Sequence, residues 1–269
     1  MPNLGALRDR LELILSIPSG DSYVDSTAQL QDIQDSYYKT SYTWDWPQLL
    51  VKRGARILSN QRKYPLPTNF RKFRYLYVLG VKYNEVEPHL IATTPRSYAV
   101  DWSTEEFIIS TLPSASGTEF TTTNAESAGQ TVTIELNSVT GLAAGDEIVF
   151  PDDGNPEVTY VASVDAAAVT ITARLDTSKS ASAVMYKGVD NIMFAFYRTV
   201  TDLSISTDTP LLPTPVHFPM LSYAAYLAYQ RLEQYTEADK QLQYWNEQMV
   251  DYWRAFDKGS TGAVTTFSV

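Results

Sequence analysis

The sequence contains no cysteine and only two histidines, His89 and His217. Without cysteine, disulfides, thiolate catalysis and cysteine-ligated metals are excluded, which fits a reducing compartment. Each histidine lies in a proline-flanked loop, so no Ser–His–Asp arrangement is indicated. We interpret both histidines as structural.

Long apolar runs are also missing. No run approaches the roughly 20 residues that span a bilayer. Close to the N-terminus, charged residues interrupt the apolar ones, unlike in a signal peptide: Arg8, Asp9, Arg10 and Glu12. We expect a soluble, non-secreted product with no membrane partner.

Recognisable catalytic motifs are equally scarce. VLGVK and MYKGVD lack the spacing of a phosphate-binding loop. The pairs Glu105–Glu106 and Asp152–Asp153 point to opposite sides if extended, which favours solvated charges over a carboxylate-based glycan hydrolase. The stretch PDDGNPE offers oxygen ligands suited to calcium, namely Asp152, Asp153, Asn155 and Glu157. Its spacing does not match an EF-hand, and a plain turn is the simpler interpretation. We predict that the protein is not an enzyme, with no catalytic residue, metal or cofactor.

Charge is present but unevenly spread, with a net value of −10. Acids dominate from Asp101 to Ser180, whereas the stretch from Pro47 to Asn84 carries only bases. The basic run could meet nucleic-acid phosphates, pair with the acidic segment of a neighbouring subunit, or form a solvated helix face. As a candidate contact for DNA or an acidic partner it comprises Lys52, Arg53, Arg56, Arg62, Lys63, Arg71, Lys72 and Arg74.

Hydrophobic spacing predicts an α+β fold, a mainly helical body with a short β-sheet and an inserted small β-barrel or sandwich. Helices are expected from Asn3, from Ser26, over residues 41–60, and as a C-terminal antiparallel pair. The strands FRYLYVLGV (73–81) and NIMFAFYR (191–198) are expected to pair, with Phe73, Tyr75 and Tyr77 on one face. The predicted domains are residues 1–110 with 188–258, the insert 111–187, and an extended tail 259–269.

Aromatic composition is the most unusual feature, with 18 Tyr and 5 Trp against 10 Phe. Buried tyrosine hydroxyls need partners, whereas tyrosine and tryptophan suit interfaces that keep one wet edge. The composition therefore favours an assembly protein, and a tyrosine-rich monomeric core is the alternative.

Four stretches together resemble the head-to-tail adaptor, or connector, proteins of tailed bacteriophages. They are SYTWDWPQLL after the first helices, YPLPTNFRKFRYLYV entering a strand, FAFYRTVTDLSISTDTPLLP, and HFPMLSYAAYLAYQRL before a second helix. The resemblance covers residues 4–103 and 189–256, about 60% of the chain. The segment 111–187 departs from a minimal adaptor.

The resemblance implies a virion protein, made in the host cytoplasm, that forms a homo-oligomeric ring of about twelve subunits. Such a ring would lie in the neck, binding the portal protein and the next tail or neck protein around the DNA exit channel. Terminal segments would order on assembly, and the tail could add a strand to a partner through Val264, Phe267 and Val269. Another neck or tail-completion protein is the alternative, and a glycan hydrolase is a more distant one.

Overall fold

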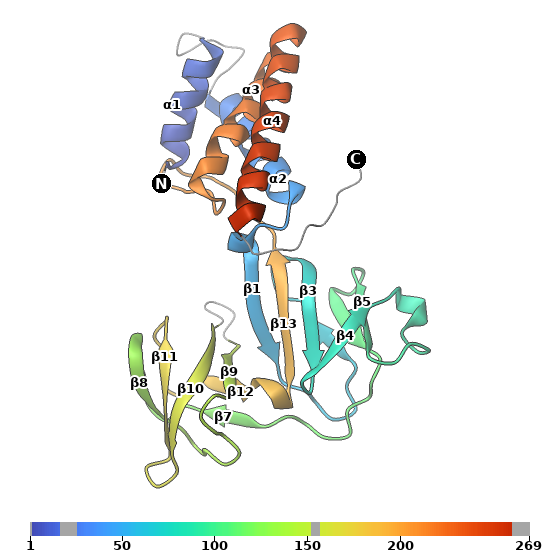
Figure 1. The fold of residues 1–269 in the computed structure, drawn as a ribbon, viewed down its shortest axis with the longest axis vertical. Helices are drawn as coiled ribbons and strands as arrows, with labels where there is room; N and C mark the ends of the chain where they lie inside the picture. Colours follow the sequence, from blue (N-terminus) through green and yellow to red (C-terminus); the bar gives the residue numbers. More distant parts are fainter. Residues whose placement is uncertain (1, 17–25, 152–156, 260–269) are drawn as a thin grey trace. The chain divides into compact units, whose positions relative to one another are not determined.

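The computed structural model describes residues 2–16, 26–151 and 157–259 (Figure 1). By its contacts the chain divides into a helical unit, residues 1–49 with 199–269, and a β unit, residues 50–198. The prediction of a mainly helical body is wrong. The described residues form 13 strands in two curled sheets and only four α-helices.

The helical unit is built from both ends of the chain. Its helices are α1 (Leu4–Leu15), α2 (Ser26–Thr43), α3 (His217–Arg231) and α4 (Tyr235–Gly259), with 3-10 turns η1 (Pro47–Leu49) and η4 (Thr214–Val216). Asn3 caps α1, as predicted, because its side chain accepts a hydrogen bond from the backbone N–H of Ala6. The predicted C-terminal hairpin is confirmed. The small residues of α3 that allow close packing are fully buried: Ala224, Ala225 and Ala228.

Tyrosines and polar side chains join the helices of this unit. Tyr37 accepts a hydrogen bond from the Leu211 N–H, and Tyr229 donates to the Ile14 carbonyl. Ser36 donates to the Met220 carbonyl between α2 and α3. Trp46 is buried and donates to the Thr40 carbonyl. Tyr37, Tyr229 and Trp46 are therefore core residues whose polar ends have partners.

The first sheet of the β unit has the order β1-β13-β3-β4-β5-β6-β2. Its strands are β1 (Leu50–Ala55), β2 (Lys63–Pro65), β3 (Phe70–Val78), β4 (Val81–Glu85), β5 (Ser97–Asp101), β6 (Glu106–Ile109) and β13 (Ile192–Arg198). In Figure 1, β13 lies between β1 and β3 although it comes much later in the chain. The predicted pairing of residues 73–81 with 191–198 is confirmed as β3 with β13, running antiparallel.

The predicted helix over residues 41–60 is wrong beyond η1, because Leu50–Ala55 forms β1. Each of these six residues pairs with one residue of β13, from Leu50 with Tyr197 to Ala55 with Ile192. Pairing with an apolar central strand outweighs the helical spacing of Leu50 and Ile57. The range 50–110, assigned to a helical body with one strand at 73–81, supplies six strands.

The second sheet has the order β7-β12-β9-β10-β11-β8. Its strands are β7 (Glu119–Thr121), β8 (Gly129–Glu135), β9 (Glu147–Phe150), β10 (Glu157–Asp165), β11 (Thr170–Leu175) and β12 (Val184–Lys187). Its two edges meet at the bridge between Thr122 and Leu136, and the Asn137 N–H donates to the Thr121 carbonyl at 2.9 Å. The sheet therefore curls around its own core, which includes Phe120, Ile134 and Phe150.

One buried side chain ties the two sheets together. Asn191 accepts a hydrogen bond from the Ile57 N–H and donates to the carbonyls of Thr118 and Lys187. It therefore links the end of β1 to the segments that enter and leave the second sheet. A Cβ at Gly117 would lie 1.9 Å from the Asn191 Oδ1 atom, so only glycine fits there.

Candidate functional site

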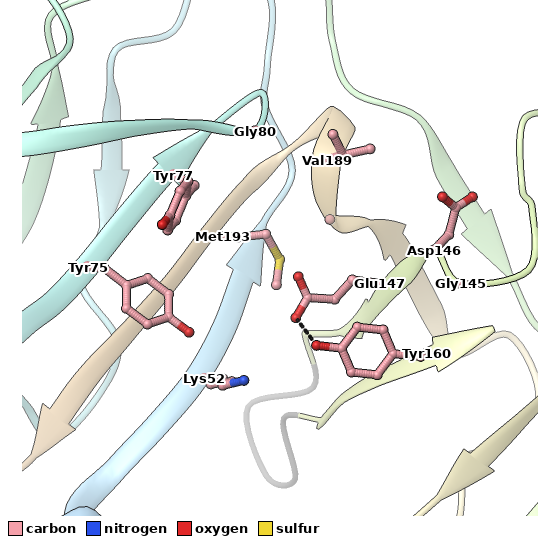
Figure 2. A pocket seen from close by; sticks show the side chains of 11 residues that line it. Lys52, Tyr75, Tyr77, Gly80, Gly145, Asp146, Glu147, Tyr160, Val189 and Met193 are labelled. Atoms are coloured by element: carbon pink, nitrogen blue, oxygen red, sulfur yellow. Dashed lines mark hydrogen bonds between the residues drawn. The ribbon is translucent and has the colours of Figure 1, made fainter. Parts of the chain in front are cut away.

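A cleft of about 650 Å³ opens between the two sheets of the β unit. Figure 2 shows tyrosines from both sheets around it, with Lys52 and Met193 on the side of the first sheet and Glu147 on the side of the second. The lining residues are Lys52, Tyr75, Tyr77, Gly80, Gly145, Asp146, Glu147, Tyr160, Gly188, Val189 and Met193.

Strand register builds the first wall of the cleft. Lys52, Ala195 and Tyr75 form one row across β1, β13 and β3. Gly54, Met193 and Tyr77 form a row two residues further along. Residues two apart on a strand share a face, so the lysine, the methionine and both tyrosines lie on one side of the sheet. The Tyr75 and Tyr77 rings meet edge to face, with centroids 5.5 Å apart.

The expectation that Phe73, Tyr75 and Tyr77 share a face is wrong. Phe73 pairs with Phe196 and Tyr75 with Ala195, so Arg74 is an extra residue on β3. Such a bulge reverses the alternation. Phe73 packs in the core of the sheet, while Tyr75 and Tyr77 turn to the cleft.

The second wall is formed by β9 and β10, where Tyr160 pairs with Glu147. The Tyr160 hydroxyl donates a long hydrogen bond of 3.4 Å to the Glu147 carboxylate. The neighbouring Asp146 is engaged elsewhere, in a 2.8 Å ion pair with Lys187 and a hydrogen bond from the Ala143 N–H. Although burial acts in the opposite direction, these two partners lower the pKa of Asp146.

Several polar groups of the cleft lack a strong partner. Among the residues that the structure describes, the Lys52 ammonium and the hydroxyls of Tyr75 and Tyr77 make no hydrogen bond or ion pair. Burial, and then the nearby Glu147 carboxylate, raise the pKa of Tyr75, so its hydroxyl stays protonated. The cleft therefore combines aromatic surface with three donors and one carboxylate that can accept.

The predicted basic run is not a helix face, because most of it lies on β1, β2 and β3 or in the connecting loops. Arg56 pairs with Glu119 of the same chain at 2.8 Å and donates to the Gly117 carbonyl, and Lys63 lies 3.5 Å from Glu106. Arg53, Arg71 and Lys72 also have interactions within the chain. The exposed members are Lys52, Arg62, Lys63, Lys72 and Arg74. Five of the eight residues are therefore exposed, and Arg56 and Lys63 already contact acids of their own chain.

The two histidines lie in different units of the chain. His217 is buried and bonds the Leu212 carbonyl at 3.0 Å, and burial lowers its pKa. His89 is exposed and lies 3.4 Å from Glu87. In the first pair of adjacent acids, Glu106 contacts Lys63. The second pair, Asp152 and Asp153, lies outside the described residues, as does the candidate calcium ligand Asn155.

Glu157, the last candidate calcium ligand, forms a buried 2.8 Å ion pair with Lys179. It also accepts hydrogen bonds from the N–H groups of Asp176 and Thr177 and from the Thr177 hydroxyl. Across residues 2–16, 26–151 and 157–259, no group of three or more metal-binding side chains is found.

Sequence reasoning missed Tyr75, Tyr77, Glu147 and Tyr160 as a group. In the sequence, only the abundance of tyrosine and the position of Tyr75 and Tyr77 directly after the basic run pointed to them. Strand register brings the residues together. The predicted docking residues Val264, Phe267 and Val269 lie outside the described residues.

Comparison with known proteins adds no assignment. No protein-family model matches the chain, and no curated protein matches it. In the described part of the chain, no helix has the length and apolar character required to cross a membrane.

Proposed function

We propose that the protein is a structural virion protein, a head-to-tail adaptor that joins the portal to the next neck or tail component. It acts as a homo-oligomeric ring of about twelve subunits around the DNA channel. The observation that carries this proposal is the set of large apolar and aromatic side chains that the helical unit leaves exposed. The residues concerned are Leu13, Tyr42, Ile205, Phe218, Tyr235, Tyr244 and Val250.

The exposed residues are separate from the core of the helical unit. On α4, Trp245 and Met249 are buried, while the adjacent Tyr244 and Val250 are exposed. On α1, Leu7 and Leu11 are buried and Leu13 is 78% exposed. Large apolar side chains that the fold of one subunit does not cover are typical of surfaces that another chain covers. A ring supplies such a cover through contacts between unlike faces of neighbouring subunits.

Exposed bases support an additional, electrostatic contact. The exposed bases Lys52, Arg62 and Arg74 suit packaged DNA or an acidic surface of a partner. Because Arg56 and Lys63 already contact acids of their own chain, we assign them a smaller share of this contact.

The copy number per particle tests the proposed function. Quantitative mass spectrometry of purified particles, scaled to the major capsid protein, should give about a dozen copies per virion. Hundreds of copies would indicate a capsid or tail-tube component and contradict the adaptor role. A chain absent from the particles would contradict any structural virion role.

Surface variants test the observation that carries the proposal. Tyr244→Ser and Tyr235→Ser should reduce incorporation into particles without lowering the melting temperature of the isolated protein, because both side chains are exposed. Gln248→Ala, an exposed polar position on α4, is the matched control and should incorporate normally. Normal incorporation of both serine variants would show that these side chains do not carry the assembly contacts.

A further inference from the structure

We propose that the cleft between the two sheets of the β unit binds a short neutral oligosaccharide. The site comprises Tyr75, Tyr77, Tyr160, Lys52 and Glu147. This inference is independent of the assembly role proposed above. It rests on the volume of the cleft, the aromatic surface it presents, and the hydrogen-bonding groups left without strong partners.

The size and lining of the cleft fit a small-molecule site. Its volume of about 650 Å³ lies within the range of roughly 300–1,000 Å³ that is typical of such sites. Tyrosines come from both walls, with Tyr75 and Tyr77 on one side and Tyr160 on the other (Figure 2). Aromatic rings offer apolar faces for the C–H surface of a sugar ring, and tyrosine keeps a polar end for its hydroxyls.

The polar groups match a ligand that both donates and accepts hydrogen bonds. The Lys52 ammonium and the hydroxyls of Tyr75 and Tyr77 can donate, while the Glu147 carboxylate accepts. Glu147 has one long hydrogen bond, from Tyr160, so it retains capacity for sugar hydroxyls. Hydroxyl groups, which donate and accept at the same atom, satisfy both kinds of partner.

The charge of the lining favours a neutral ligand. Asp146 is compensated by Lys187, and the remaining charges are Lys52 and Glu147, which have opposite signs. A phosphate would meet one lysine and be repelled by Glu147. A quaternary ammonium group would find aromatic faces but be repelled by Lys52, which lies in the same row as Tyr75.

Saturation-transfer NMR on the full chain tests the proposal, with maltotriose, cellotriose and triacetylchitotriose as probes. At least one should receive saturation and bind with a dissociation constant on the order of 1 mM. Tetramethylammonium and inorganic phosphate serve as charged comparison ligands. Binding of none of the three saccharides, or displacement of the bound saccharide by either charged ligand at a lower concentration, would overturn the proposal.

Variants then locate the site. Tyr77→Ala and Glu147→Gln should each weaken saccharide binding roughly tenfold, the loss expected for one stacking or one charge-assisted contact. Lys52→Ala changes an exposed side chain, so it provides a test if either of the other variants fails to fold. Gln248→Ala, at an exposed polar position of the helical unit, is the control. Unchanged affinity in the cleft variants, or an equal loss in the control, would overturn the assignment to this cleft.

Discussion

The helical unit and the β unit each bury one carboxylate beside a base, and they stabilise it differently. In the helical unit, Asp32 is 1% exposed and is held by Arg231 through hydrogen bonds of 2.6 and 3.0 Å. In the β unit, Glu157 is held by Lys179 and by three further hydrogen bonds from Asp176 and Thr177. The number and kind of donors therefore distinguish the two sites.

The pKa values of the two acids move in opposite directions. Burial raises the pKa of Asp32 from 3.8 to about 6, because it outweighs the charge and hydrogen bonds of Arg231. Burial acts in the same direction on Glu157, yet Lys179 and the N–H and hydroxyl donors outweigh it and lower its pKa. Asp32 is buried more deeply than Glu157 and is held by a single partner, so its pKa rises, whereas the less deeply buried Glu157 has an ion pair together with backbone and hydroxyl donors.

Connectivity also separates the two units. The β unit is one continuous segment, residues 50–198, whereas the helical unit combines two segments, 1–49 and 199–269. Leu50 pairs with Tyr197, so the chain enters and leaves the β unit on adjacent strands, roughly 5 Å apart.

The largest expected effect comes from separating the units. Residues 50–198 alone should fold cooperatively, since their contacts are internal, while residues 1–49 alone should stay unfolded without α3. Circular dichroism with thermal unfolding checks both. As the control, residues 1–49 joined to 199–269 by a short Gly/Ser linker should regain cooperative helical unfolding. Failure of that chain to fold would show that the helical unit depends on the β unit.

Adding a methyl group to one glycine in each unit should have opposite effects. Gly117→Ala places Cβ against Asn191 and the Asp190 carbonyl, so it should destabilise the β unit by about 3 kcal/mol or more. Gly5→Ala lies in α1 with contacts no shorter than 3.4 Å and should stabilise the helical unit by up to about 1 kcal/mol. Denaturant unfolding measures both. Equal effects would contradict the described packing around Gly117.

Removing the base of each ion pair should have unequal costs. Lys179→Met leaves an ionised acid buried and should destabilise the β unit by about 3–5 kcal/mol near neutral pH. Arg231→Met should cost less, about 2 kcal/mol, because Asp32 takes up a proton more readily and Arg231 itself is 38% exposed. Tryptophan fluorescence reports the second variant, since Trp44, Trp46, Trp245 and Trp253 lie in the helical unit. A larger cost for Arg231→Met would contradict this ranking.

The pH-dependent effects of the two acids are opposite in sign. Asp32 has a raised pKa in the folded state, so its contribution to stability is present at low pH and is lost as pH rises from about 4 through 6. Glu157 has a lowered pKa, so its contribution is present above its ordinary value of 4.5 and is lost as pH falls through its folded value. Carboxyl-carbon NMR titration should show Asp32 titrating near 6 and Glu157 below 4.5.

Variants provide the control for that titration. Relative to Asp32→Asn, the wild-type helical unit should lose about 2 kcal/mol of stability between pH 4 and pH 7, most of the free-energy equivalent of the shift from 3.8 to about 6. Relative to Glu157→Gln, the wild-type β unit should gain stability over the interval below pH 4.5. If the pKa values of both acids were shifted in the same direction from their ordinary values, the distinction between the two sites would be lost.

Elements whose burial follows one local period were predictable. Leu4, Leu7, Leu11 and Leu15 are all buried on α1, as their spacing predicts. The β11 residues Ile171, Ala173 and Leu175 are buried at a period of two, which fits the predicted β character of the insert. In both elements, one stripe of one helix or strand faces one core.

The strand β1 and the bulge in β3 were not predictable. The spacing of Leu50 and Ile57 resembles a helical stripe, yet β1 forms because β13 is available as a partner. The bulge at Arg74 is visible only in the pairing of β3 with β13. Of the proposed saccharide site, the sequence indicated only that tyrosine is abundant and that Lys52 belongs to a basic run.

The sequence by itself determined the four-leucine stripe of α1, the C-terminal helical hairpin and the pairing of the two aromatic strands. Only the tertiary structure decided that Leu50–Ala55 is a strand and that Tyr75 faces Glu147 across a cleft. Hydrophobic period is a local property of the chain and can be read along it. Register, bulges and the approach of two sheets depend on partners distant in sequence, which no local pattern encodes.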